Sequence, residues 1–214
     1  MKIGILWDLD GTLLDTLEDL ADAVNYALSQ YGYPQRTLEE VRRFVGNGAK
    51  NLIGKAVPEE VDPAPVFACF QVYYAAHCQI KTRPYAGIAQ ALKQLEKHPM
   101  AVVSNKPDVA VKPLCAQYFP GVYALGERPD CPRKPAPDMV LRAMADIGVE
   151  NCIYVGDSEV DVLTAQNAEV PCLSVLWGFR DRAEIEAAGG THFCGRVEEL
   201  APKLEEMIRD LTAE

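Results

Sequence analysis

Short apolar runs that end abruptly in polar residues recur along the chain. They lie at residues 2–7, 100–103, 152–155 and 172–177. Runs of this length without polar alternation are typical of parallel strands that are buried on both faces. Apolar residues at helical spacing follow the runs, over 88–95, 139–147, 162–166 and 200–211. This alternation predicts an open, doubly wound α/β fold with a parallel, Rossmann-like sheet.

About seventy residues after the first run contain no comparable strand. They carry helical patterns at 17–31, 38–45, 49–57 and 64–80. We therefore expect residues 16–84 to form an inserted, all-helical cap, and residues 1–15 and 85–214 to form the α/β core. Both borders of the insert lie near the end of the first strand. This places the cap over the carboxyl edge of the sheet, where open α/β sheets bind ligands.

Composition limits the possible partners. The 214 residues are 49% hydrophobic, enough for a full core, and carry 21 Lys and Arg against 31 Asp and Glu, a net charge of −10. This charge argues against a nucleic-acid partner. No apolar run approaches the roughly 20 residues that span a bilayer, so we expect no membrane partner. The first run is also too short for a signal-peptide core, which predicts a cytoplasmic location.

Two carboxylates directly follow the first predicted strand, in the segment Asp8-Leu9-Asp10-Gly11-Thr12. Both acids leave the sheet at its carboxyl end, and Gly11 permits a tight turn beside them. The pair is a candidate nucleophile and proton-transfer partner. A polar turn or a helix cap is the structural alternative.

Two later segments could hold a phosphate. Ser104-Asn105-Lys106 follows the second predicted strand, where a hydroxyl and backbone N–H groups at a helix entrance can bind phosphate oxygens. Lys134-Pro135 precedes a predicted helix. Taken alone, the first segment could equally be a helix cap, and Lys134 a solvated loop lysine.

A fourth segment combines a strand end, a glycine and two acids. Gly156-Asp157-Ser158 follows the third predicted strand, and Asp161 lies four residues beyond Asp157. Clustered carboxylates favour a hard cation, and Mg²⁺ commonly uses one or two of them together with phosphate and water. Capping of the following helix is the alternative interpretation.

In this order the four segments closely resemble the motifs of the haloacid dehalogenase-like hydrolase superfamily, and within it the phosphoglycolate phosphatase-type branch. The resemblance implies that Asp8 attacks phosphorus to form an aspartyl-phosphate and that Asp10 transfers the protons. It further implies that Ser104 and Lys134 hold the phosphoryl group. The residues that it assigns to Mg²⁺ are Asp8, the Asp10 backbone carbonyl, Asp157 and Asp161.

The resemblance also suggests substrate contacts. Gly11, Thr12 and Asn105 belong to motifs that face the substrate, and the segment Gly46-Asn47-Gly48 resembles a cap loop of the branch. With Lys50, Asn47 could reach a substrate carboxylate, although the segment could equally be a flexible break between cap helices. Trp7 and Ser104 stand where the family more often has Phe and Thr.

The resemblance implies a Mg²⁺-dependent phosphatase acting on a small phosphorylated metabolite, with 2-phosphoglycolate as one candidate. A β-phosphoglucomutase-like sugar-phosphate mutase of the same fold is an alternative, as is a non-catalytic binding protein. An acid at position 10 distinguishes the chain from the dehalogenase and phosphonate-cleaving branches. A monomer and a homodimer are both compatible with the sequence.

Overall fold

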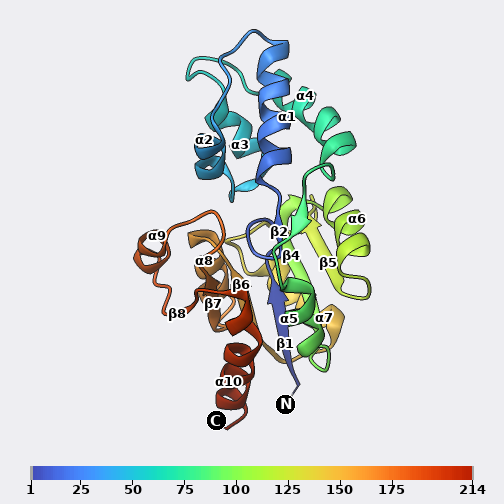
Figure 1. Ribbon diagram of the computed structural model, residues 1–214, viewed down its shortest axis with the longest axis vertical. Helices are drawn as coiled ribbons and strands as arrows, with labels where there is room; N and C mark the ends of the chain where they lie inside the picture. Colours follow the sequence, from blue (N-terminus) through green and yellow to red (C-terminus); the bar gives the residue numbers. More distant parts are fainter. Residues whose placement is uncertain (1, 214) are drawn as a thin grey trace.

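The computed structural model describes residues 2–213 and contains a six-stranded sheet in the order β5-β4-β1-β6-β7-β8, with parallel neighbours throughout (Figure 1). The strands are β1 (Ile3–Trp7), β4 (Met100–Pro107), β5 (Tyr123–Glu127), β6 (Asn151–Gly156), β7 (Cys172–Val175) and β8 (His192–Cys194). The predicted α/β fold class is confirmed. The strand order reverses beside β1, so the end of β1 lies at the crevice where such sheets place their ligands.

Helices cover both faces of the sheet. They are α5 (Ile88–Gln94), α6 (Asp108–Tyr118), α7 (Asp138–Ile147), α8 (Glu159–Asn167), α9 (Arg182–Ala187) and α10 (Leu200–Ala213), with a 3₁₀ turn, η1 (Val197–Glu199). Side chains alternate along β1. Ile5 and Trp7 pack in the cluster that contains residues of α5, α6 and α10, whereas Leu6 packs with α7 and α8. A strand buried on both faces must be continuously apolar, as β1 is.

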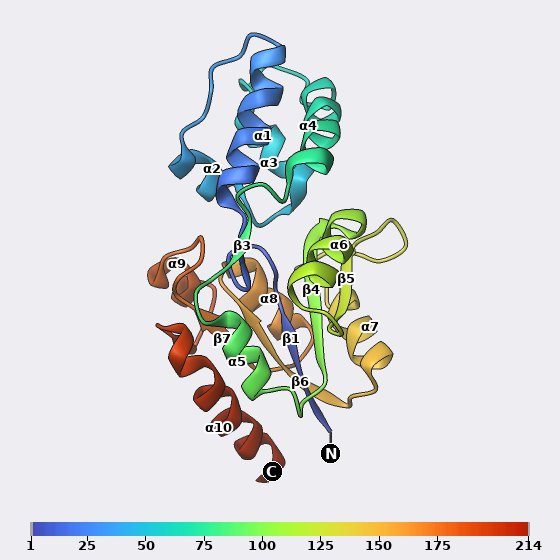
Figure 2. The ribbon, with the colours of Figure 1, turned by 45° about the vertical axis from the view of Figure 1, so that its right-hand side comes forward.

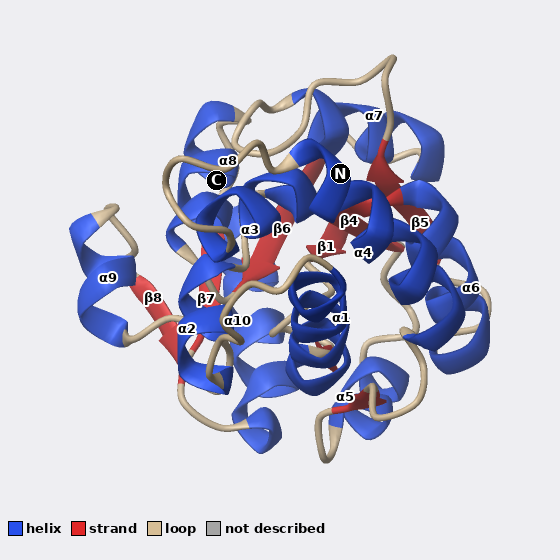
Figure 3. Ribbon diagram, turned by 90° about the horizontal axis from the view of Figure 1, so that it is seen from above, coloured by secondary structure: helices blue, strands red, loops and turns tan. Residues whose placement is uncertain are grey.

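Four further helices form a separate layer, which we call the cap. They are α1 (Leu17–Gln30), α2 (Leu38–Phe44), α3 (Gly48–Ala56) and α4 (Ala64–His77). Their apolar faces form a second cluster around Val24, Leu28, Ile53 and Phe70, which Phe179 of the core also joins. Seen from above, the cap helices lie over the sheet (Figure 3).

A narrow connection joins the cap to the core (Figure 2). It consists of two short antiparallel strands, β2 (Leu14–Asp15) and β3 (Arg83–Pro84). No helix within residues 2–213 is both long and apolar enough to cross a bilayer.

The structure corrects several predicted boundaries. The second predicted strand does not end at Val103 but continues to Pro107, so Ser104 lies within β4 and not after it. Pairing with β5 is interrupted after Val103 and resumes between Pro107 and Glu127, which explains why the apolar run stops early. The last cap helix ends at His77, three residues before the predicted end. The fourth run ends as a strand at residue 175, and β5 and β8 were not predicted.

Candidate active site

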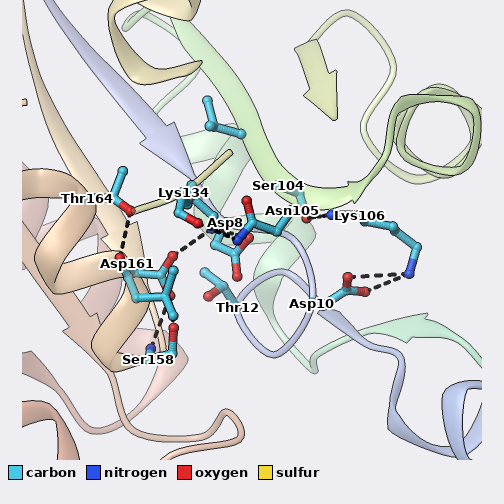
Figure 4. Close-up of polar contacts among 12 residues, drawn as sticks. Asp8, Asp10, Thr12, Ser104, Asn105, Lys106, Lys134, Ser158, Asp161 and Thr164 are labelled. Carbon is cyan, nitrogen blue, oxygen red and sulfur yellow. Dashed lines mark hydrogen bonds and ion pairs between the residues drawn. The ribbon is translucent and has the colours of Figure 1, made fainter. Parts of the chain in front are cut away.

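The loop after β1 sends its two acids in different directions. The backbone N–H groups of Leu13 and Leu14 both donate to the carbonyl of Leu9, at 3.1 and 2.9 Å, which closes a tight loop. Within this loop Asp8 turns toward Lys134, whereas Asp10 turns toward Lys106 (Figure 4). The two neighbouring carboxylates therefore occupy different electrostatic environments.

Lys134 connects two of the predicted site acids. Its Nζ donates to Asp8 Oδ1 at 2.8 Å, to Asp161 Oδ1 at 2.7 Å and to the Tyr154 hydroxyl at 3.0 Å. Only 3% of Lys134 is exposed. Burial lowers the pKa of Lys134, but Asp161 and Asp8 outweigh it and the net pKa is raised. The side chain therefore carries its positive charge inside the site.

Burial has the opposite effect on the acids. It raises the pKa of Asp8 to about 7, because desolvation and the neighbouring Asp161 outweigh the attraction of Lys134. The pKa of Asp157 is also raised, first by burial and then by repulsion from Asp161 and Asp8. One buried lysine does not neutralise this concentration of negative charge, so the cluster favours a further cation.

Asp157 is held by groups on both sides of it. Thr12 Oγ1 donates to Asp157 Oδ1 at 3.2 Å, and the backbone N–H of Phe179 donates to Oδ2 at 2.7 Å. Gly11, whose φ is +86°, and Gly178 both approach so closely that a Cβ at either position would collide with the Asp157 carboxylate. Gly11 and Thr12 thus shape the pocket of Asp157.

Asp161 lies at the start of α8 and already has many hydrogen-bond partners. Its Oδ2 accepts from Asp157 N at 3.2 Å, Ser158 N at 3.1 Å and Ser158 Oγ at 2.6 Å. Asp8, Asp157 and Asp161 each offer one oxygen within 4.8 Å of the others. Three buried carboxylates at this spacing fit a hard divalent cation.

Ser104 and Asn105 lie beside these acids. Ser104 Oγ accepts from Lys106 N at 3.3 Å, so its own hydrogen is left to donate. Asn105 Nδ2 donates to Lys134 O at 2.9 Å and to Gly46 O, in the cap, at 3.2 Å. Asn105 therefore joins the Lys134 loop to the cap.

The sequence named Lys106 only as part of the segment Ser104-Asn105-Lys106, without a role of its own, and did not point to Tyr74. Lys106 Nζ lies 3.0 and 3.3 Å from the two oxygens of Asp10 and also donates to the hydroxyl of Tyr74, on α4. Burial lowers the pKa of Lys106, but Asp10 and Tyr74 outweigh it and raise the net value. Lys106 lies two residues after Ser104 in the same strand, and residues at this spacing face the same side of a sheet. This spacing could have indicated that Lys106 faces the site together with Ser104.

A cavity of about 140 Å³ lies between the cap and the core. Its lining includes the proposed site residues Asp8, Asp10, Ser104, Asn105, Lys134 and Asp157. Of the predicted cap loop, Gly46 and Gly48 line the cavity, but Asn47 and Lys50 do not. Lys50 is exposed, because α3 turns Leu52 and Ile53 toward the interior of the cap. Contrary to expectation, Asn47 and Lys50 thus lie outside the cavity in this structure.

Comparisons with known proteins identify the family of the chain. The model of the family described as haloacid dehalogenase-like hydrolase matches residues 5–175, and the chain belongs to this family. Phosphoglycolate phosphatase 1 of Pseudomonas aeruginosa is 31% identical, over 92% of this chain and 78% of its own. The phosphoglycolate phosphatase of Pseudomonas putida is 34% identical, over 86% of this chain and 72% of its own.

A solved structure of a predicted phosphoglycolate phosphatase from Lactobacillus delbrueckii subsp. bulgaricus superposes with a TM-score of 0.90. The two chains are 37% identical, and the match covers 95% of this chain and 99% of the other. A fold shared over nearly the full length includes the cap as well as the sheet. The resemblance to the phosphoglycolate phosphatase branch is therefore confirmed.

Proposed function

We propose that this protein is a Mg²⁺-dependent phosphatase that hydrolyses a small phosphate monoester through an aspartyl-phosphate. One observation carries the proposal. The loop after β1 directs Asp8 into a buried cluster suited to a cation, and directs Asp10 out of that cluster into the same cavity. A nucleophile and a separate proton donor are the two groups that this reaction needs.

Asp8 attacks phosphorus, and the phosphorus–ester oxygen bond breaks. Asp10 gives a proton to the departing alcohol and then takes one from the water that hydrolyses the aspartyl-phosphate. Ser104 contributes a free hydroxyl hydrogen to the phosphoryl oxygens. Lys134 offsets their charge while it holds Asp8 in place. Positioning and electrostatic stabilisation are the main contributions that a protein makes to phosphoryl transfer.

Asp8 and Asp157 would hold the cation through side-chain oxygens, with the backbone carbonyl of Asp10 beside them. Asp161 accepts from Lys134, Asp157 and Ser158 and so orients these groups, and we keep it as a ligand of the cation, directly or through water. Mg²⁺ suits a site of few carboxylates completed by phosphate and water, and when bound it neutralises phosphoryl charge.

Two observations support a small metabolite as substrate, with 2-phosphoglycolate first among the candidates. The cavity is lined by residues of both the cap and the core, so the cap limits the space beside Asp8 and Asp10. The relatives from Pseudomonas aeruginosa and Pseudomonas putida bear the name phosphoglycolate phosphatase. We further propose that residues 16–84 act as one unit that covers the cavity during the reaction and excludes bulk water.

A phosphate-release assay tests the proposal. Purified protein is given 2-phosphoglycolate, several sugar phosphates and p-nitrophenyl phosphate, each with Mg²⁺ or with excess EDTA. We expect turnover of small esters with Mg²⁺ and none with EDTA. Full activity in EDTA would contradict the metal assignment. Turnover of a sugar phosphate that depends on added sugar bisphosphate would identify a mutase, and inactivity on every ester would refute the phosphatase.

A further inference from the structure

The buried ammonium of Lys134 has a third partner that the proposed reaction does not use, the hydroxyl of Tyr154 on β6. Lys134 Nζ lies between Asp8, at 2.8 Å, and Asp161, at 2.7 Å (Figure 4). It also donates to the hydroxyl of Tyr154 at 3.0 Å. An ammonium carries three protons, so each of them already has an acceptor. A phosphoryl oxygen can receive an N–H from Lys134 only if one of these three bonds opens.

The hydroxyl of Tyr154 is fixed beside the ammonium. It donates its proton to the backbone carbonyl of Val103 at 3.1 Å, and the centroid of the ring lies 5.5 Å from Lys134 Nζ. Burial is the largest of the effects that raise the pKa of Tyr154, which keeps the hydroxyl protonated. Lys134 and Asp8 line the cavity, whereas Tyr154 is fully buried and does not line it. The ammonium therefore has the substrate space and the phenol as separate neighbours.

The bond to Tyr154 is the easiest of the three to open. Asp8 and Asp161 are buried acids that lie closer to the ammonium, and loss of its proton would leave either of them short of a partner. Tyr154 is neutral, and its own proton stays with Val103 when Lys134 moves away. Hydrogen bonds between two charged groups are stronger than those to a neutral oxygen. A negatively charged phosphoryl oxygen therefore replaces the phenol at the lowest cost.

We propose that Tyr154 is a positioning residue that accepts the third proton of Lys134 in the free enzyme and yields it to a phosphoryl oxygen when substrate enters. The inference rests on the phosphatase function proposed above. The exchange keeps the buried ammonium fully hydrogen-bonded in both states. It also weakens the binding of phosphate, because the bond to Tyr154 must break, and it thereby favours release of the product.

The test measures the affinity for inorganic phosphate, as its inhibition constant against hydrolysis of p-nitrophenyl phosphate. Tyr154→Phe removes the hydroxyl and keeps the ring. One N–H of Lys134 then lacks its acceptor in the free enzyme, whereas phosphate supplies an acceptor in the complex. The inhibition constant should therefore fall by about tenfold, the usual weight of a buried donor left without a partner. A general disturbance of the site would raise the inhibition constant instead.

Stability gives a second measurement, with two control variants. Tyr154→Phe should unfold at a lower urea concentration than wild type, and phosphate should stabilise it more than wild type, because stabilisation by a ligand grows with affinity. Ile153→Val, in the same strand, changes a residue of the opposite core cluster. It should lower the stability and leave the inhibition constant unchanged. Tyr123→Phe removes an exposed hydroxyl that donates to Asp146 and should also leave the inhibition constant unchanged.

A crystal structure of wild type with phosphate decides the question if Tyr154→Phe does not fold. Lys134 Nζ should then lie within about 3.2 Å of a phosphate oxygen and more than about 3.5 Å from the hydroxyl of Tyr154. Phosphate bound in the cavity while Lys134 still donates to Tyr154 would overturn the exchange.

The outcomes distinguish the two proposals. If wild type neither hydrolyses a phosphate ester nor binds phosphate, both fail. If wild type hydrolyses p-nitrophenyl phosphate and Tyr154→Phe has an unchanged or higher inhibition constant, only the exchange fails. An equal fall of the inhibition constant in Ile153→Val would also overturn the exchange, because the effect would then come from lost stability.

Discussion

Arg180, in the loop after β7, donates a hydrogen bond of 2.6 Å to the backbone carbonyl of Val45 in the cap. The same guanidinium donates to Arg42 O at 3.1 Å and pairs with Glu159 at 2.9 Å. Arg42 in turn donates to Gly178 O at 3.1 Å. Carbonyls at the end of a helix lack intrahelical partners, so Arg180 satisfies the last turn of α2 while it fastens the cap to the core.

Arg180→Met should loosen this attachment. Loss of several charge-assisted hydrogen bonds predicts a fall of about tenfold in kcat/KM. Amide hydrogen exchange should accelerate in α2 and remain unchanged in β1 and β6. The control is Arg182→Met, which removes an exposed arginine paired with Glu186. Unchanged exchange in α2 would show that Arg180 does not hold the cap.

Asp8→Asn should abolish turnover and leave the fold intact. The amide has nearly the same shape as the carboxylate but cannot attack phosphorus. Phosphate release should fall by about a thousandfold or more, with an unchanged circular dichroism spectrum. Asp130→Asn changes an exposed acid in the same way and should keep full activity. Steady-state turnover by Asp8→Asn above contaminant level would exclude Asp8 as the nucleophile.

The raised pKa of Asp8 predicts how the stability of the metal-free protein depends on pH. The pKa is about 7 in the folded protein against an ordinary 3.8, so the folded state holds an additional proton between these values. The contribution of Asp8 to the free energy of unfolding is therefore fully present below about pH 4 and is lost as the pH rises to about 7. Urea unfolding in EDTA should show this loss for wild type relative to Asp8→Asn. If the free energy of unfolding changed with pH in the same way for both proteins, the raised pKa of Asp8 would be contradicted.

Gly178→Ala should weaken activation by Mg²⁺. A Cβ at this position would collide with the Asp157 carboxylate, which would have to move from its place beside Asp8. Displaced supporting groups commonly reduce metal affinity by about 10- to 100-fold, so the Mg²⁺ concentration for half-maximal activity should rise by a similar factor. Gly54→Ala is the matched control, because no atom beyond the neighbouring residues and the backbone of its own helix lies within 4 Å of the added carbon. An equal Mg²⁺ requirement in both variants would refute this role of Gly178.

Features that depend on local pattern can be predicted from the amino-acid sequence alone. Continuous apolar runs identified β1, β4, β6 and β7, because strands covered on both faces cannot alternate with polar residues. Asp8 and Asp157 directly follow two such runs, and parallel strands bring their carboxyl ends to one edge of the sheet. Apolar residues at helical spacing located the four cap helices. They recur at this spacing because each helix turns one apolar face toward the cluster inside the cap.

Which side chains become buried beneath the cap depends on how the cap packs against the core. Lys50 and Lys106 both belong to segments that the sequence linked to the substrate, yet Lys50 is exposed while Lys106 is enclosed between Asp10 and Tyr74. Tyr74 lies 32 residues from Lys106 in the chain, and Val45 lies 135 residues from Arg180. No periodicity extends across such distances. Burial, pKa and hydrogen bonding at these positions arise only when the cap packs on the core, because desolvation depends on every element that surrounds a charge.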